Sequence, residues 1–285
     1  MPDEGYLGAA AEKMSLEQQE VYLTNLGLRD PLLIQLKNFY IGLFQGDLGK
    51  SVTYRTDVPV LDIIQDKMMY SIVFGLGAVA LSLLIGVPLG IFMAQFKGRW
   101  LDRLGTGYIV FVVAVPAMVY FLMIQMYISD WFNLPMLFDE YNPKSFILPL
   151  FCLALGPIAS YAMWMRRYMV DELNKDYIKL ARAKGVTERT IMFSHVMRNA
   201  FIPMAQYLPA TILFTITGSI YIESLFSIPG MGGLLVDAIQ RQDNNVVQGL
   251  VLVFSSLGII GLILGDILMA IVDPRIKLGK GDSVR

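Results

Sequence analysis

The sequence predicts an all-α protein, a polytopic bundle of transmembrane helices, and three observations support this fold class. Apolar residues make up 55% of the chain and charged residues only 16%, with a mean hydropathy of +0.54. The apolar residues gather in runs of twenty or more, long enough to cross a hydrocarbon core of about 30 Å as helices. The loops between these runs alternate in the sign of their charge. Lipid is therefore the expected solvent for most of the chain.

The first 69 residues differ from the rest of the chain. They carry ten acidic and six basic residues and contain no apolar run of spanning length. We expect residues 1–69 to form an extracytoplasmic region and residues 70–285 a transmembrane domain. No basic start followed by an apolar stretch precedes residue 70, so nothing there resembles a signal peptide. Either the first span directs its own insertion, or an upstream helix is missing from this sequence.

Five apolar segments after this region are long enough to span a membrane, and five is the number of spans that we predict. Most charged residues lie between the segments. The predicted spans are Tyr70–Phe96, Leu104–Ile128, Ser145–Met165, Pro203–Phe226 and Val246–Val272.

The charges of the loops predict the orientation, because basic loops are retained in the cytoplasm. The stretch 166–200 carries eight Lys or Arg against four Asp or Glu, and the short loop 97–103 is also basic. The connections 129–144 and 237–243 are net acidic. We therefore expect the basic loops and the C-terminal tail to be cytoplasmic, and the acidic connections and the N-terminal region to face outward.

The cytoplasmic loop 171–203 is predicted to form two short helices. Asn174 or Asp176 could cap the first helix, and Gly185 suits the left-handed position that ends it. Thr187 is a candidate cap for the second, which we expect to end near residue 199 because a proline at position 203 disfavours a longer helix.

Such an elbow could dock into a groove on a cytoplasmic partner. Its first helix has small side chains at Ala181 and Ala183 beside basic ones at Lys179, Arg182 and Lys184. The alternative is a short basic helix that rests on lipid headgroups.

The loop also resembles a known family. Its residues 176–203 read D-Y-I-K-L-A-R-A-K-G-V-T-E-R-T-I-M-F-S-H-V-M-R-N-A-F-I-P, which is similar to the conserved cytoplasmic loop of binding-protein-dependent ABC permeases of the dipeptide and oligopeptide type. Further stretches match this family in order from about residue 27 onward. They are Gly46–Ser51, Gly86–Gly90, Glu223–Gly232, Leu234–Ile239, Val246–Gly249 and the terminal D-P-R-I at Asp273–Ile276.

The resemblance implies a fold like that of type I ABC importer permeases, which usually have six spans, so it favours a missing upstream helix. It implies a subunit in the cell membrane of a prokaryote that forms a substrate pathway with a homologous permease subunit. It further implies two cytoplasmic ATP-binding subunits and an extracytoplasmic substrate-binding protein. The implied cargo is oligopeptides or dipeptides, with nickel complexes, sugars and other small solutes as alternatives. The residues that the resemblance assigns to ATPase coupling are Tyr177, Ile178, Ala181, Arg182, Ala183, Lys184, Gly185, His195 and Arg198.

Several motifs that would indicate enzyme chemistry are incomplete. The stretch 46–51, G-D-L-G-K-S, ends like a phosphate-binding loop, but Phe44 stands where the first glycine belongs. Cys152 is the single cysteine and His195 the single histidine, so we expect no metal site. We therefore predict a transporter subunit and not an enzyme, with no cofactor and no nucleic-acid partner. The alternatives are a secondary transporter or channel, and an intramembrane enzyme.

Two acidic residues in the predicted spans are candidates for the pathway or its gating. Glu223, near the outer end of the fourth span, could contact substrate or extend to the membrane surface. Asp266 in the fifth span should face the bundle interior or pair with a basic group. The segment 228–245 is too short and polar to span, and could lie on the outer surface or dip toward the pathway. The glycine pairs with G-x-x-x-G spacing are expected to pack helices closely, namely Gly86 with Gly90 and Gly261 with Gly265.

Overall fold

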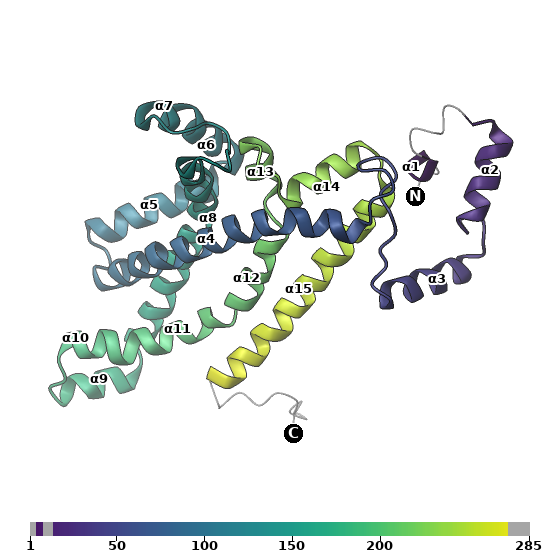
Figure 1. The fold of residues 1–285 in the computed structure, drawn as a ribbon. Helices are drawn as coiled ribbons and strands as arrows, with labels where there is room; N and C mark the ends of the chain where they lie inside the picture. Colours follow the sequence, from purple (N-terminus) through teal and green to yellow (C-terminus); the bar gives the residue numbers. More distant parts are fainter. Residues whose placement is uncertain (1–3, 8–13, 273–285) are drawn as a thin grey trace, which may run out of the picture. The chain divides into compact units, whose positions relative to one another are not determined.

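The computed structural model describes residues 4–7 and 14–272, and within this part of the chain the regular secondary structure is helical (Figure 1). One isolated bridge, between Lys50 and Pro59, is the strand-like pairing found there. The predicted all-α class is confirmed. The predictions for the D-P-R-I motif and the basic tail fall on residues 273–285, which lie outside the described residues.

Three helices are long and apolar enough to cross a membrane. They are α4 (Val60–Gln95), α8 (Ile147–Leu173), which continues the 3-10 turn η3 (Pro143–Phe146), and α15 (Asn244–Val272). Two bent helix pairs also pass the same test, and with each pair taken as one span the total is five, as predicted.

The second predicted span is bent at a proline. The helix α5 (Trp100–Ala114) ends before Pro116, and the helical stretch 117–132 turns away from it by 107°. Val115 has extended backbone angles (φ −92°, ψ 130°) because the ring of a following proline disfavours the helical conformation. The sequence predicted a span here but not the bend within it. The stretch 117–132 consists of α6 (Ala117–Met123), the π-helix η2 (Ile124–Ile128) and α7 (Ser129–Phe132).

The fourth predicted span is also broken. A helix α12 (Leu208–Ile216) is followed by α13 (Ile220–Phe226), bent by 42°. Gly218 lies between them with φ +73°, a left-handed conformation that ends a helix. The continuous span predicted from residue 203 to residue 226 is therefore not observed.

The chain divides into two compact units, residues 1–72 with 216–256 and residues 73–215 with 257–285. The core of the first unit is apolar and joins three helices. Val60 and Ile63 of α4 are fully buried there with Met231 of α14 and Val246 of α15. Besides α4 and α15, the helices of this unit are α1 (Glu4–Leu7), α2 (Leu16–Asn25), α3 (Leu32–Phe44), α13 and α14 (Met231–Gln240).

Two boundaries in the first unit differ from the predictions. Helix α4 begins at Val60, ten residues before the predicted span, because its first turns bury Val60, Ile63 and Ile64 in this core. Helix α14 is the amphipathic segment predicted between residues 228 and 245. It buries Leu234 and Ala238 in the same core and leaves Ile239 exposed.

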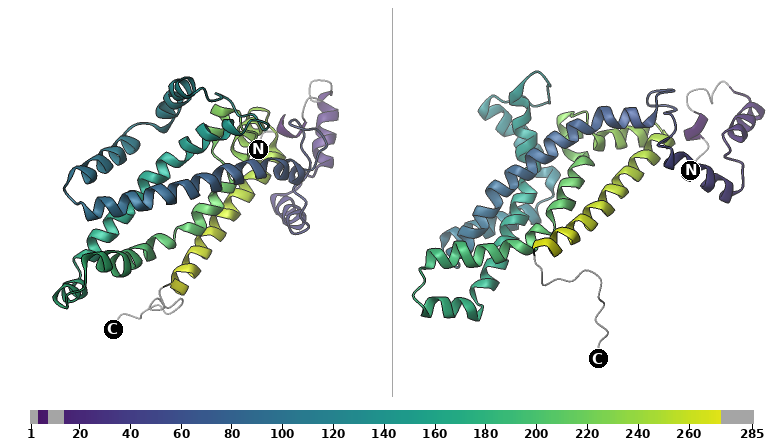
Figure 2. Two further views of the ribbon diagram at one scale, coloured as in Figure 1. Left: turned by 60° about the vertical axis from the view of Figure 1, so that its left-hand side comes forward. Right: turned by 60° about the horizontal axis from the view of Figure 1, so that its bottom comes forward.

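The second unit contains α5 to α12 and an extensive apolar core. That core joins α4, α8 and the helices of the loop 171–203 through Ile91, Met165, Met169, Ile178 and Val196. Figures 1 and 2 show the loop helices gathered at one end of α8. These helices are α9 (Asp176–Ala183), α10 (Glu188–Thr190), the π-helix η4 (Ile191–Val196) and α11 (Met197–Ala205).

Glycines bring helices of the second unit into close contact, as their spacing predicts. A Cβ added at Gly86 would lie 2.8 Å from the carbonyl oxygen of Ile158, and one at Gly90 would lie 2.7 Å from the Cβ of Met165. Both contacts join α4 to α8. The pair in α15 serves the same purpose, since Gly261 lies against Ala210 of α12.

A buried ion pair that the sequence did not reveal joins α5 to α8. Asp102, with a side chain 7% exposed, receives a bidentate pair of hydrogen bonds from Arg166, with Nη2 2.9 Å from Oδ2. The same carboxylate accepts the amide of Gly98 at 2.8 Å. The charge is therefore well satisfied where α5 begins.

Candidate functional site

The first arm of the cytoplasmic-loop candidate ends as its sequence predicts. Gly185 follows α9 with φ +78°, and its amide donates to the carbonyl of Arg182 at 2.9 Å. The amide of Val186 reaches back to the carbonyl of Ala181 at 3.1 Å. These two bonds form a Schellman motif, in which the left-handed position strongly favours glycine.

The start of α9 differs from the prediction. Its N-cap is Lys175, and no side chain caps the helix. Asn174 donates instead to the carbonyl of Val170 at 3.0 Å and closes α8, while Asp176 is the first residue of α9 and pairs with Lys179 at 2.8 Å. The helix therefore starts directly from the end of the long span before it.

The second arm begins at the predicted cap and runs further than predicted. The amide of Thr190 donates to Thr187 Oγ1 at 3.4 Å. From there α10, η4 and α11 continue to Ala205, past Pro203. The predicted stop near residue 199 was wrong. Ala200 and Met204 on either side of the proline are buried in the core of the unit, and this burial stabilises the helix against the loss of one amide donor.

One face of α9 is fixed to its own chain and the opposite face is open. Ile178 is fully buried, so this residue of the predicted coupling set packs inside the unit and is closed to a partner. Leu180 is 56% exposed. The residues of the open face, referred to below as the α9 outer face, are Lys179, Leu180, Arg182, Ala183 and Lys184.

The two arms are linked across Gly185 by an ion pair. Arg182 Nε lies 2.7 Å from Glu188 Oε1, and Nη2 lies 3.2 Å from the second carboxylate oxygen. The hydrogen bond from Arg182 lowers the pKa of the Glu188 carboxyl, so the pair stays charged at neutral pH. The bidentate geometry limits how far α10 can swing relative to α9.

A closed triangle of hydrogen bonds links α9 to α8 and α11. Tyr177 Oη donates to Glu172 Oε1 of α8 at 2.6 Å, and Asn199 Nδ2 of α11 donates to both, at 3.2 Å to Glu172 and 3.0 Å to Tyr177. Burial and the bond to Glu172 raise the pKa of Tyr177 to about 12, so its hydroxyl remains a donor at neutral pH. The Tyr177 hydroxyl can therefore donate to Glu172 at neutral pH in the Glu172–Tyr177–Asn199 triangle.

The remaining predicted coupling residues lie on a different surface. His195 and Arg198 line a cavity of about 930 Å³ in the second unit. The structure thus does not bring the predicted set together on one surface. Only three of its members lie on the α9 outer face, and two line this cavity. Ile178 is buried, Ala181 packs against the core, Tyr177 belongs to the triangle and Gly185 ends the helix. The other lining residues are Val87, Glu172, Ser194, Met197, Asn199, Phe201, Ile202, Pro203 and Met269.

Glu223 is buried in the first unit, with a relative exposure of 3%. Its carboxylate accepts hydrogen bonds from Ser71 Oγ at 2.8 Å, from the amide of Gly233 at 2.9 Å and from the amide of Ser219 at 3.2 Å. A side chain extended to the membrane surface would be exposed. The carboxylate instead joins α13, α14 and α4 within the first unit.

Three glycines make room for this carboxylate. A Cβ at Gly218 or Gly230 would overlap the carboxylate of Glu223, and one at Gly232 would lie 3.1 Å from Oε2. Two of these glycines belong to the motif E-S-L-F-S-I-P-G-M-G. These three glycines, referred to below as the glycine cage, thus surround the carboxylate of Glu223, the first residue of the motif.

Asp266 lies beside the turn between α11 and α12. Gln206 follows α11 and donates from Nε2 to Asp266 Oδ1 at 3.1 Å, while Gly265 lets the carbonyl of Gln206 approach α15 closely. Asp266 is exposed on the described part of this chain. An acidic group in a membrane span avoids lipid, so it belongs against protein or a water-filled path.

The loop that resembles a phosphate-binding loop is bonded within its own unit. Asp47 Oδ1 accepts the amide of Gly49 at 2.8 Å, and Ser51 Oγ donates to the buried Asp243 at 2.6 Å. The amides of Val52 and Thr53 donate to the same Asp243 oxygen, as does that of the next residue. Burial would raise the pKa of Asp243, but these hydrogen bonds outweigh it and hold the pKa below its usual value. The serine hydroxyl is therefore occupied by a carboxylate of the chain itself.

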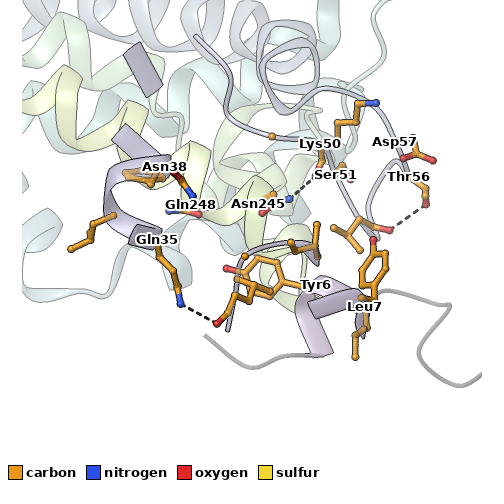
Figure 3. A pocket seen from close by; sticks show the side chains of 18 of the residues that line it. Tyr6, Leu7, Gln35, Asn38, Lys50, Ser51, Thr56, Asp57, Asn245 and Gln248 are labelled. Atoms are coloured by element: carbon orange, nitrogen blue, oxygen red, sulfur yellow. Dashed lines mark hydrogen bonds between the residues drawn. The ribbon is translucent and has the colours of Figure 1, made fainter. Parts of the chain in front are cut away.

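A second cavity, of about 880 Å³, lies in the first unit (Figure 3). Two amide side chains of its wall are already bonded to backbone, Gln35 to the carbonyl of Leu28 at 2.9 Å and Asn245 to that of Lys50 at 2.8 Å. The wall mixes aromatic, amide and charged side chains. Its labelled residues in the figure are Tyr6, Leu7, Gln35, Asn38, Lys50, Ser51, Thr56, Asp57, Asn245 and Gln248.

Among the described residues there is no group of three or more His, Cys, Asp or Glu side chains that could hold a metal ion. The sequence did not identify the polar residues that hold these sites together, namely Glu172, Asn199, Ser71 and Asp243. Asp243 alone left a readable signal, because it directly precedes a long apolar helix and caps it through the amide of Val246 at 3.3 Å.

Comparison with known proteins places these features in a family. Residues 86–278 match the model of the binding-protein-dependent transport system inner membrane component. The oligopeptide transport system permease protein AppB of Bacillus subtilis is 33% identical over 276 residues, covering 93% of this chain and 87% of AppB. The dipeptide transport system permease protein DppB of Lactococcus lactis is 32% identical, covering 93% of this chain and 88% of DppB.

Other relatives match over part of their length or at the level of fold. The oligopeptide transport system permease protein AmiC of Streptococcus pneumoniae is 38% identical over 211 residues, which are 73% of this chain but 42% of AmiC. An inward-facing structure of the MetNI methionine ABC transporter has a TM-score of 0.62 at 13% identity. That match covers 74% of this chain and 96% of the other, and it shows a shared fold.

Proposed function

The chain belongs to the family of binding-protein-dependent transport system inner membrane components, and on this premise we propose that it is a permease subunit of an ATP-driven peptide importer. The family is one of transport-system membrane proteins and not of enzymes. In this proposal a homologous permease completes the substrate pathway. Two cytoplasmic ATP-binding subunits supply the energy, and an extracytoplasmic binding protein delivers the cargo.

The observation that carries the proposal is the construction of α9. The helix is fixed by buried Ile178 and by the Glu172–Tyr177–Asn199 triangle, while Leu180 and the basic residues of the outer face are open. A helix that is rigidly seated on one side and accessible on the other suits a contact that passes motion between subunits. We therefore assign the α9 outer face to contact with an ATP-binding subunit.

The assignment sets an orientation for the chain in the cell membrane of a prokaryote. Helix α9 and the loop 97–103 face the cytoplasm, and the N-terminal region up to residue 59 faces outward. The acidic balance of that region and the basic balance of the stretch 166–200 support this orientation. Oligopeptides or dipeptides are the proposed cargo, because AppB and DppB are named for them.

Purification and transport in a defined membrane test the proposal. The chain is co-expressed with the proposed ATP-binding subunits and the homologous permease, purified through a tag on this chain, and reconstituted in vesicles with the binding protein. We expect a complex that contains ATP-binding subunits and takes up labelled peptide only with ATP. Peptide uptake that proceeds without ATP and stops when an ionophore dissipates the ion gradient would instead establish a secondary transporter.

A further inference from the structure

Two adjacent residues, Tyr177 and Ile178, hold α9 through different kinds of contact, one polar and one apolar. Ile178 enters the apolar core of the second unit, where Ile191, Val196 and Met169 are also buried. Tyr177 points its hydroxyl to the polar triangle. Neighbouring residues on a helix project about 100° apart, so the two contacts hold different sides of α9.

The triangle joins α8, which precedes α9, to α11, which follows it. Glu172 lies in the last turn of α8, and Asn199 lies in α11, 27 residues further along the chain. Tyr177 of α9 contacts both. Each side chain in the triangle is bonded to the other two, so none can shift without straining a second bond.

We propose that the Glu172–Tyr177–Asn199 triangle is the joint that passes a displacement of α9 to α8 and α11 together. The proposal rests on the assignment of the α9 outer face to an ATP-binding subunit. Without the triangle, a force on Leu180 or its exposed neighbours would bend the backbone at residues 174–175 or at Gly185 and would not move α8 and α11. With the triangle closed, α9 moves as one body with the ends of both segments.

The geometry makes Tyr177, Glu172 and Asn199 positioning residues, which act through α9 and need not touch the ATPase. Hydrogen-bond acceptance by Glu172, and not its charge, is the property that the triangle uses. A glutamine at this position keeps an oxygen that can accept from both Tyr177 and Asn199. An alanine removes it.

The test uses the full reconstituted importer with Tyr177→Phe, Asn199→Ala, Glu172→Ala and Glu172→Gln. Three quantities are measured for each: the ATP-binding subunit that co-purifies, the rate of ATP hydrolysis, and the peptide taken up per ATP hydrolysed. We expect Tyr177→Phe, Asn199→Ala and Glu172→Ala to keep the co-purifying ATPase and to lower uptake per ATP by roughly fivefold, the effect of losing about one net hydrogen bond. Glu172→Gln should retain the parental ratio.

A purely structural role would lower the thermal stability and the yield of assembled complex without changing uptake per ATP. That result, or an unchanged ratio in both Tyr177→Phe and Glu172→Ala, would overturn the proposal. Loss of coupling in Glu172→Gln equal to that in Glu172→Ala would also contradict it, because charge would then be the operative property. If the parent complex takes up no peptide, the proposed function itself fails, and the two failures are thus distinguishable.

Discussion

The hydroxyl of Ser71 donates a 2.8 Å hydrogen bond to the buried carboxylate of Glu223, from a position 152 residues earlier in the chain. The same hydroxyl accepts the amide of Met231 at 2.8 Å. One serine thus links α4 to both α13 and α14 within the first unit. The contact fixes the hairpin that carries the glycine cage.

Substituting Ser71→Ala should destabilise the first unit. The change removes one hydrogen-bond donor to the buried carboxyl group of Glu223 and leaves the amide of Met231 without its partner, at a cost of about 2 kcal/mol. Thermal unfolding of the purified protein in detergent measures the loss. Ser160→Ala is the matched control, because Ser160 Oγ bonds only within its own helix, to the carbonyl of Gly156 at 3.2 Å. Equal melting temperatures for the two variants would show that the Ser71 contact is not formed.

Low pH should weaken the hydrogen bonds between Asp243 and the loop that begins at Ser51. The folded-state pKa of Asp243 lies below its usual value, so its stabilising effect is complete above the unfolded pKa of about 4 and is lost as the pH falls through the lower folded value. Asp243→Asn should remove this step from the dependence of unfolding free energy on pH. It should also cost about 2 kcal/mol at pH 7. Asp47→Asn, in the same loop, is the control, and an acid-side loss in Asp243→Asn as large as in the parent would refute the assignment.

Replacing Gly185 by valine should uncouple ATP hydrolysis from uptake. A Cβ at Gly185 meets no atom within 4 Å, so the effect comes from the backbone, where φ of +78° costs a branched residue about 1–2 kcal/mol. Gly185→Asn, which tolerates this conformation, should keep most of the uptake. Gly98→Val provides the control, since Gly98 has the same φ and equally open space outside the 171–203 loop. Equal losses in Gly185→Val and Gly98→Val would assign the effect to general strain.

Gly90→Leu should disrupt the contact between α4 and α8. A side chain there would collide with Met165 and with the backbone of α8, and overpacking of this kind costs about 1–3 kcal/mol or prevents folding. The yield and melting temperature of the purified protein report the effect. Gly107→Leu tests the same change in α5, where no atom lies within 4 Å of the added Cβ, and it should be tolerated. Similar yields for both variants would contradict the packing.

The apolar runs predicted five spans because membrane insertion depends on hydropathy over about 20 residues. The structure has three helices that pass as spans, and five if each bent pair is counted as one. The apolar runs did not predict continuity. The break at Val115 follows from the proline after it and could have been predicted from the local sequence. The interruption at Gln206, between α11 and α12, coincides with the approach of Gly265, a contact between segments about 60 residues apart, which no local pattern contains.

The loop 171–203 was likewise predicted only in its local features. Gly185 and Thr187 were predicted correctly because turn and cap chemistry is local. The triangle of Glu172, Tyr177 and Asn199 was not, because it forms only when three helices are packed. Burial of Ile178 likewise depends on that packing, which is why a residue first assigned to a partner lies inside the unit.

Site-directed crosslinking of the α9 outer face tests the central claim most directly. The single cysteine, Cys152, is fully buried, so a Cys152→Ala background allows one reactive thiol to be placed at Leu180, which is 56% exposed. We predict that Leu180→Cys in the assembled importer crosslinks to an ATP-binding subunit and that Leu137→Cys, on the connection expected outside the cell, does not. A thiol at residue 180 that reacts with a membrane-impermeant reagent added outside intact cells, and forms no crosslink to an ATPase, would contradict the account.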